Sequence, residues 1–383
     1  RQRQMCIRDR DMTADLGVAD TVFNFYTKND IYNANGELIL KADELITIVK
    51  TDKNGKASLN TDLPLMSEGY NKAEDKTGLN SGDYYFVEDK ISDSYYIDKT
   101  PVEIHLEYKD AKTAKIKAEA KKLNKATEVN LSKVKLTDNT ELAGASLKIT
   151  DEAGNEIISW ISGNADSIKI TDKADELGYR NLRATMVNGN LVINGLLQNA
   201  VYEMTETRPA DGFATAESIK FTVSDTGEVQ KVRMKDDTIK VEILKTDKKN
   251  NKKLPDAEFT FKLDGKKVVT VKTDKNGVAK IDGKLIAGKT YDVEETKAPE
   301  GYKTVPAFKY KVKDTGKVQT IKVSDERSGD ATPATPNWRD SGANSPQTGD
   351  FSNPLFWITL FLLSFVGIVI SRYKIRKKDE EAN

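Results

Sequence analysis

Short segments rich in Val, Ile, Thr, Tyr and Phe fill the chain from residue 11 to about residue 326. Polar turns such as Asp-Lys-Asn-Gly, Asp-Glu-Ala-Gly-Asn and Asp-Thr-Gly separate these segments. β-Branched and aromatic residues favour strands, and these turn sequences are typical of the connections between them. The pattern therefore predicts an all-β fold built of sandwich domains.

The strand pattern repeats along the chain, which indicates serial domains. The clearest copy covers residues 238–326 and contains the phrases VEILKTD, TDKNG and YDVEETKAPEGY. A middle copy, residues 128–237, contains VNLSK, ELAGA and YEMTET. The first copy, residues 11–127, keeps TDKNG and YYFVE but lacks the APEGY ending. We therefore expect three sandwiches in series.

These phrases resemble the Cna protein B-type, prealbumin-like domains of Gram-positive adhesins and SpaA-type pilins, and YDVEETKAPEGY resembles the E-box of that family. The resemblance implies an internal isopeptide bond between a lysine of the first strand and an Asn or Asp of the last strand, assisted by the E-box glutamate. The corresponding residues are Lys133, Glu206 and Asp236 in the middle copy, and Lys245, Glu295 and Asp325 in the third copy. The same interval separates glutamate from aspartate in both copies, from 206 to 236 and from 295 to 325.

The chemistry of such a bond depends on burial. A core of low dielectric favours a neutral amine and neutral carboxylic acids, because charged groups lose their hydration there. A neutral lysine can attack a protonated aspartate while the glutamate polarises the carbonyl and transfers the proton. The alternative is that Lys133 and Lys245 lie on exposed strand faces and the glutamates bind turn backbone. In the first copy we expect Asn124 to be an acceptor without a donor, and therefore no bond.

Residues 1–10, RQRQMCIRDR, are unrelated to the repeats and lack the apolar core of a signal peptide. They resemble the translation of a transposase adapter used in sequencing libraries, so we expect an artefact at the edge of a truncated gene. The strand that opens the first copy would then be missing. The alternative is a natural basic N-terminus.

The C-terminal part combines three features in a fixed order. Residues 354–371 are apolar enough to span roughly 27 Å of membrane as a helix, and the basic residues between 372 and 378 should stay cytoplasmic. A Pro-containing spacer over 327–344 leads to the motif Ser345, Pro346, Gln347, Thr348 and Gly349. This order resembles a sortase cell-wall sorting signal, although Ser345 replaces the usual Leu. The resemblance implies that a sortase attacks the carbonyl of Thr348 and passes it to an amine of peptidoglycan or of a pilin. A plain tail-anchored protein is the alternative.

Composition argues against several classes of function. The 60 Lys plus Arg residues balance the 60 Asp plus Glu residues, which does not suggest a nucleic-acid binder. The single cysteine, Cys6, and the single histidine, His105, supply no disulfide framework, metal cluster or Cys/His catalytic pair. We therefore expect no cofactor, no metal and no enzymatic activity.

The sequence predicts a fragment of a Gram-positive surface protein that is held transiently in the membrane and then attached covalently to the cell wall. Its expected role is the stalk of an adhesin, with any host or matrix ligand bound by a part upstream. A basal or tip pilin is one alternative, although the segment Phe25-Tyr26-Thr27-Lys28-Asn29 lacks the Pro of a pilin lysine motif. A wall-anchored enzyme with its catalytic domain upstream is the other.

Overall fold

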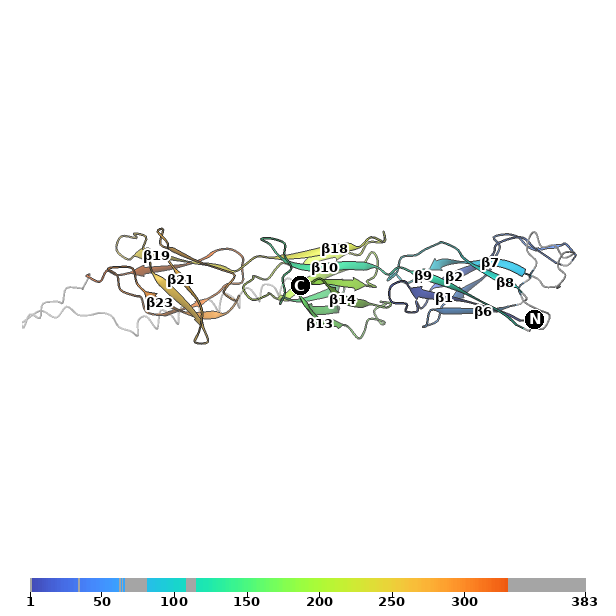
Figure 1. Ribbon diagram of the computed structural model, residues 1–383, viewed down its shortest axis with the longest axis horizontal. Helices are drawn as coiled ribbons and strands as arrows, with labels where there is room; N and C mark the ends of the chain where they lie inside the picture. Colours follow the sequence, from blue (N-terminus) through green and yellow to red (C-terminus); the bar gives the residue numbers. More distant parts are fainter. Residues whose placement is uncertain are drawn as a thin grey trace, which may run out of the picture. The chain divides into compact units, whose positions relative to one another are not determined.

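The computed structural model describes residues 2–33, 35–61, 63, 65, 81–107 and 115–329. These residues form strands and turns without a helix, which confirms the expected all-β class. The strands make three successive sandwiches, called sandwich 1, 2 and 3 below, each with its own buried apolar cluster (Figure 1).

Sandwich 1 is built from the strands β1 (Gln2–Asp11), β2 (Val22–Thr27), β3 (Ile31–Tyr32), β4 (Leu38–Leu40), β5 (Leu45–Lys50), β6 (Lys56–Thr61), β7 (Ser81–Lys90), β8 (Val102–Glu107) and β9 (Lys115–Asn124). One sheet has the order β6-β1-β9 and the other the order β5-β2-β7-β8, while β3 and β4 form a small hairpin. The alternating pattern of β2 buries Phe23 and Phe25 between the two sheets.

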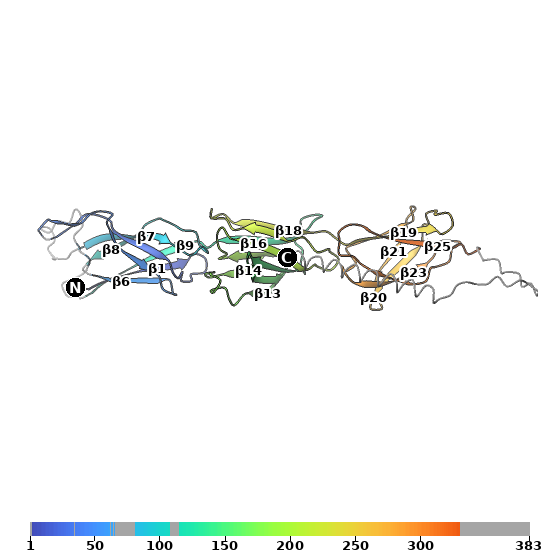
Figure 2. The same ribbon diagram turned by 180° about the vertical axis from the view of Figure 1, so that it is seen from behind.

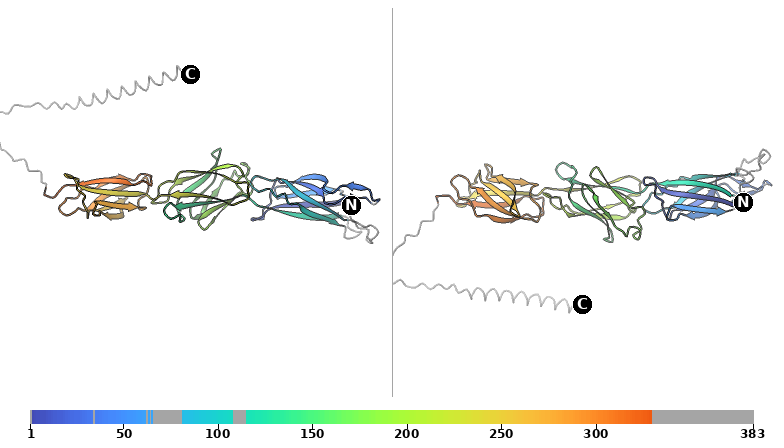
Figure 3. Two further views of the ribbon diagram at one scale, coloured as in Figure 1. Left: turned by 90° about the horizontal axis from the view of Figure 1, so that it is seen from above. Right: turned by 60° about the horizontal axis from the view of Figure 1, so that its bottom comes forward.

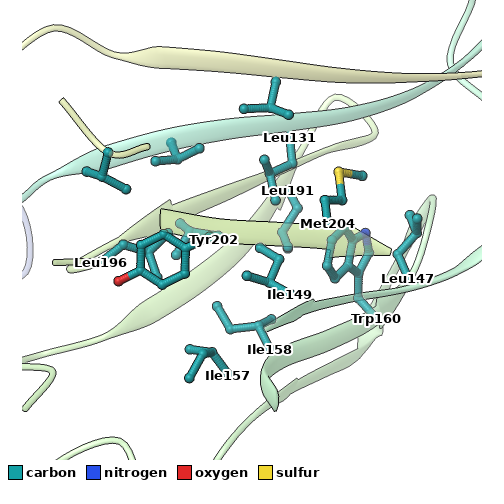
Figure 4. Packing of buried hydrophobic residues seen from close by; sticks show 14 of the residues in the cluster. Leu131, Leu147, Ile149, Ile157, Ile158, Trp160, Leu191, Leu196, Tyr202 and Met204 are labelled. Atoms are coloured by element: carbon teal, nitrogen blue, oxygen red, sulfur yellow. The ribbon is translucent and has the colours of Figure 1, made fainter. Parts of the chain in front are cut away.

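Sandwich 2 is built from the strands β10 (Glu128–Lys135), β11 (Ser146–Asp151), β12 (Glu156–Ile161), β13 (Asn164–Ile170), β14 (Arg183–Val187), β15 (Asn190–Asn194), β16 (Val201–Arg208), β17 (Ile219–Thr222) and β18 (Gln230–Asp236). Its sheets have the orders β14-β15-β10-β18 and β13-β12-β11-β16-β17. Both sheets contribute to the core, Leu131 and Leu191 from the first and Trp160 and Met204 from the second (Figure 4). Burial of each such side chain contributes on the order of 2 kcal/mol to folding.

Sandwich 3 is built from the strands β19 (Lys240–Asp247), β20 (Glu258–Leu263), β21 (Lys266–Lys272), β22 (Val278–Asp282), β23 (Thr290–Lys297), β24 (Phe308–Lys311) and β25 (Gln319–Asp325). Its sheets have the orders β22-β19-β25 and β21-β20-β23-β24, and Figure 3 gives two further views of the ribbon. The strict alternation of β19 buries Val241, Ile243 and Lys245 on one face. A lysine therefore lies in the apolar row of its strand.

The first and last strands of each sandwich are parallel neighbours. β10 pairs with β18 (Figure 1), β19 with β25 (Figure 2), and β1 with β9. In sandwich 3 Lys245 lies opposite Val323, and Asp325 follows two residues later on the same face. Because side chains alternate along a strand, this register places the lysine diagonally across from the aspartate on the inward face.

Sandwich 1 differs from the sequence-based expectation at its first strand. We expected this strand to be missing, but residues 2–11 form β1, which pairs with β6 and β9. Met5 and Ile7 supply the buried side chains that the position requires. The alternation of apolar and polar residues is therefore sufficient for pairing, whereas the adapter origin of residues 1–10 stays a prediction.

The spacer, the sorting motif at 345–349 and the apolar segment 354–371 lie, apart from residues 327–329, outside the described residues. Within the described part of the chain, no helix has the length and apolar character needed to cross a membrane.

Candidate isopeptide-forming sites

Sandwich 3 brings together the three residues that the sequence assigned to its crosslink. Nζ of Lys245 contacts Oδ1 of Asp325 and lies 2.8 Å from Oε1 of Glu295. The side chains of all three residues have 0% exposure. An amine and two carboxyl groups therefore share one site without water access.

Neighbouring strands hold this site in place. The ring of Phe259 on β20 lies 5.2 Å from Nζ of Lys245 and forms an apolar wall. Oε2 of Glu295 accepts a hydrogen bond of 2.9 Å from the backbone N–H of Val305. This bond fixes the glutamate on β23, so that its other oxygen faces the lysine.

Sandwich 2 repeats the arrangement. Nζ of Lys133 contacts Oδ1 of Asp236 and lies 2.8 Å from Oε1 of Glu206, with side-chain exposures of 1% or less. Oε2 of Glu206 accepts a hydrogen bond of 2.6 Å from the backbone N–H of Ala216. The alternative that Lys133 and Lys245 lie on exposed strand faces is therefore wrong.

In both sites the surroundings raise the pKa of the acceptor aspartate. Burial, opposed by the lysine and reinforced by the neighbouring glutamate, raises the pKa of Asp236 to about 7 and that of Asp325 to about 6. Among the described residues, Oδ2 of each aspartate and Oε1 of each glutamate receive no hydrogen bond, although Nζ of the lysine lies 2.8 Å from Oε1 in both sites. A proton held by one of the two carboxyl groups would satisfy these buried oxygens.

Sandwich 1 has the same strand register at this site but different side chains. Asp11 lies opposite Asn124 in the β1–β9 register, so Asp9, two residues earlier, occupies the place of Lys133 and Lys245. Nδ2 of Asn124 donates to Oδ1 of Asp9 at 2.6 Å and to Oε1 of Glu88 at 3.2 Å. Burial raises the pKa of Asp9 to about 6 and that of Glu88 to about 7. An amide thus stands between two buried carboxyl groups.

The nearby amine of Lys122 does not replace the missing one. Its Nζ donates to Oδ2 of Asp98 at 2.8 Å and to the carbonyl of Thr100 at 3.0 Å. We expected Asn124 to be an acceptor without a donor. In the structure its amide contacts two carboxyl groups, that of Asp9 at the position of the reactive lysine and that of Glu88 at the position of the E-box glutamate.

Glu88 and Asp9 are site residues that sequence reasoning did not assign. A tyrosine precedes each E-box glutamate by four positions, as in the segments 84–88, 202–206 and 291–295, and this signal identifies Glu88. Oε2 of Glu88 also accepts from the backbone N–H of Asp98 at 3.0 Å, ten positions further on, as Glu206 and Glu295 do from theirs. Asp9 had no comparable signal, because no repeat phrase covers residues 1–10.

A hydrogen-bonded pair of a tyrosine and an aspartate lies at one end of sandwich 1 and of sandwich 3. The hydroxyl of Tyr95 donates to Asp11 at 2.9 Å, and the hydroxyl of Tyr302 donates to Asp247 at 2.8 Å. Sandwich 2 has Lys135 and Phe213 at the corresponding positions. Among the described residues, no three His, Cys, Asp or Glu side chains gather as metal ligands.

Comparison with known proteins gives a family match. The model of the SpaA prealbumin-like fold domain matches residues 127–238 and 239–327. No curated protein sequence matches the chain significantly.

Several solved structures are similar to the chain. The Bacillus anthracis TIE protein is 23% identical, with 85% of this chain and 51% of that chain covered and a TM-score of 0.38. A streptococcal ancillary pilin is 16% identical, with 86% and 100% covered and a TM-score of 0.32. The major pilin SpaD from Corynebacterium diphtheriae is 13% identical, with 86% and 98% covered and a TM-score of 0.33. The chain thus spans about half the length of the first of these structures.

Proposed function

The chain belongs to the family of proteins with SpaA-type prealbumin-like domains, and from this we propose that it is the stalk of a sortase-anchored adhesin on a Gram-positive cell surface. Sandwiches 2 and 3 are stiffened by isopeptide bonds from Lys133 to Asp236 and from Lys245 to Asp325. The observation that carries the proposal is the contact of a buried lysine with a buried aspartate, beside a glutamate, at the same register in two sandwiches.

Bond formation is a condensation within the folded domain. The lone pair of the lysine Nζ attacks Cγ of the protonated aspartate, and the glutamate accepts a proton from the nitrogen. The glutamate then returns the proton to the departing hydroxyl, so that the C–O bond breaks and one water leaves. The product is an amide, and the glutamate is unchanged. Exclusion of water from the site favours the neutral reactants.

The bonds close long loops. Lys133 and Asp236 are 103 positions apart, and Lys245 and Asp325 are 80 apart. In the loop-entropy model each crosslink stabilises its sandwich by on the order of 4 kcal/mol.

Intact mass tests the crosslinks. We expect segment 128–326 to be lighter than its sequence mass by two waters, and Glu206→Ala and Glu295→Ala each to restore one of them. Circular dichroism serves as the control that both variants remain folded. The full sequence mass in a folded wild-type segment would contradict the proposed bonds.

Anchoring is proposed from the sequence motif alone, because Thr348 lies outside the described residues. Co-expression with a sortase should release a product that ends at Thr348 and is joined to peptidoglycan. Thr348→Ala should block this transfer, whereas Ser345→Leu, which restores the commonest motif, should keep it. Attachment to a pilin lysine instead of peptidoglycan would favour the pilin alternative.

A further inference from the structure

Sandwich 1 has an apolar outer face on the sheet β5-β2-β7-β8. Tyr26 lies between Leu45 and Tyr85 across this sheet, and its ring stacks on Tyr85 with centroids 5.2 Å apart. In the next outward row Asn24 lies between Ile48 and Val87. Leu45 is 48% exposed and Ile48 is 58% exposed. Large apolar side chains therefore gather on a face that points away from the core.

The other two sandwiches have polar residues at the equivalent outward positions. In sandwich 2 the row of Asn24 corresponds to Lys148 between Ser159 and Thr205. In sandwich 3 it corresponds to Thr260 between Thr270 and Glu294. The shared fold thus does not require apolar residues here, and a patch of this kind commonly marks an interaction surface.

The same strand is a sheet edge, and its register with β2 shifts between Phe25 and Tyr26. Within the described residues, no strand pairs with the outer side of β5. The equivalent strand β12 is covered by β13 in antiparallel register, and the equivalent strand β21 contains Lys266, Lys267 and Lys272. Covering strands and lysines are the usual protection of sheet edges. β5 has a single lysine at its end, Lys50, which pairs with Asp20 at 2.7 Å.

The backbone of Ile48 faces this open edge. Thr51 donates to the carbonyl of Thr21 at 2.9 Å and accepts from the N–H of Asp20 at 3.1 Å, so its peptide groups face the β2 side. Because successive residues of a strand alternate, the N–H and C=O of Ile48 point away from β2. Ile48 therefore offers both an exposed side chain and free backbone groups.

We propose that β5 pairs with β5 of a second copy of this chain, antiparallel and centred on Ile48. Each Ile48 then exchanges two backbone hydrogen bonds with Ile48 of the second copy, and Thr47 lies opposite Val49. Over residues 47–49 this register keeps outward residues opposite outward residues, and it joins two four-stranded sheets into one.

A second copy fits this edge because the surface is complementary to itself. The free backbone groups and the exposed side chains of Leu45 and Ile48 lie on one strand, so a two-fold axis through Ile48 brings both features of each copy to the other. The pairing of β13 with β12 in sandwich 2 shows that this edge of the fold accepts an antiparallel strand. The inference does not depend on the isopeptide bonds or on anchoring.

Cysteine crosslinking on the full chain in detergent tests the register. In a Cys6→Ser background, Ile48→Cys places two Cα atoms about 5.5 Å apart across the axis, which is within disulfide range. Val268→Cys on β21, where Val268 is 41% exposed, is the control for chance collisions at an exposed site of the equivalent edge strand. Under mild oxidation we expect covalent dimers of the Ile48→Cys variant to form on the order of tenfold faster than those of the control. Equal rates would overturn the proposal.

Sedimentation velocity supplies a second readout on uncrosslinked protein. Ile48→Lys should weaken self-association by on the order of tenfold, because two lysines would face each other across the axis. Val268→Lys should leave self-association unchanged. Both variants keep the C-terminal part of the wild type, so any association through that part is common to all three proteins. Identical sedimentation of the wild type and Ile48→Lys at every concentration would also overturn the proposal.

Discussion

Sandwiches 1 and 3 place polar groups at the same three positions of the same frame, yet only one set can condense. In sandwich 3 an amine lies beside Glu295 and Asp325, whereas in sandwich 1 the amide of Asn124 lies between two carboxyl groups. Strand register and burial are common to both sites. The fold therefore sets the geometry of the site, while one residue of the first strand sets its chemistry.

The largest expected effect comes from giving sandwich 1 the missing amine. Asp9→Lys should place Nζ against the side chain of Asn124, with Glu88 as the assisting carboxyl. The amine would then displace the amide nitrogen, so the protein should lose one ammonia in an intact-mass measurement. The loop of 115 positions implies a gain of on the order of 4 kcal/mol in the free energy of unfolding.

The loss of ammonia separates this bond from those proposed in the other sandwiches, where water leaves. Combining Asp9→Lys with Asn124→Ala should abolish the loss and leave any deficit from sandwiches 2 and 3 intact. A folded Asp9→Lys protein of unchanged mass would show that position 9 does not control the chemistry of the site.

The second prediction concerns pH. The pKa of Asp9, about 6, and that of Glu88, about 7, exceed their ordinary values of 3.8 and 4.5. The folded state of sandwich 1 therefore binds more protons than the unfolded state between these limits, and its stability falls as the pH rises from about 4 to about 7. Since one pKa unit corresponds to about 1.4 kcal/mol, the loss is on the order of a few kcal/mol.

Hydrogen exchange of β7 and β9 amides, corrected for the intrinsic rate at each pH, measures this loss. Asp9→Asn should remove the part of the loss that Asp9 contributes and leave the part that Glu88 contributes. In sandwich 3 the amides of β23 and β25 should show little change over the same range, because the proposed isopeptide bond would remove Asp325 as a titrating acid. Matching profiles in the two sandwiches would contradict the contrast between them.

The smallest expected effect concerns the tyrosine at one end of sandwich 1 and of sandwich 3. Tyr95 is fully buried and donates to Asp11, so Tyr95→Phe should lower the free energy of unfolding of sandwich 1 by about 2 kcal/mol. Tyr302 is partly exposed, so water can replace the lost bond and Tyr302→Phe should cost sandwich 3 less. Denaturant titration of each variant measures the difference. A larger loss in the free energy of unfolding from Tyr302→Phe than from Tyr95→Phe would contradict this prediction.

Local patterns were sufficient to predict the fold class and much of the site. Alternation in VEILKTD predicts a strand, and the family resemblance singles out Lys245 within it. The resemblance also names Asp325 as the partner of Lys245, whereas the parallel register of β19 and β25 that brings the two side chains together comes from the structure.

Other features were hidden for physical reasons. Glu88 and Asn124 are further apart in sequence than the corresponding pairs, because the connection from β7 to β9 is longer in sandwich 1. The segment LITIVK of β5 is apolar on both faces, so alternation alone could not tell which side chains remain exposed. Asp9 lies in residues that share no phrase with the repeats.

The parallel pairing of first and last strands determines how a pulled chain extends. Because both strands run in the same direction, the chain enters a sandwich at one end and leaves it at the other. Without a crosslink, tension must shear this ladder, and unfolding from Lys133 to Asp236 then releases 103 residue steps, or roughly 350 Å of extended chain. With the amide in place, tension passes directly from Lys133 to Asp236, and the intervening strands form a closed loop that carries no load. The stalk would then keep its length under pulling.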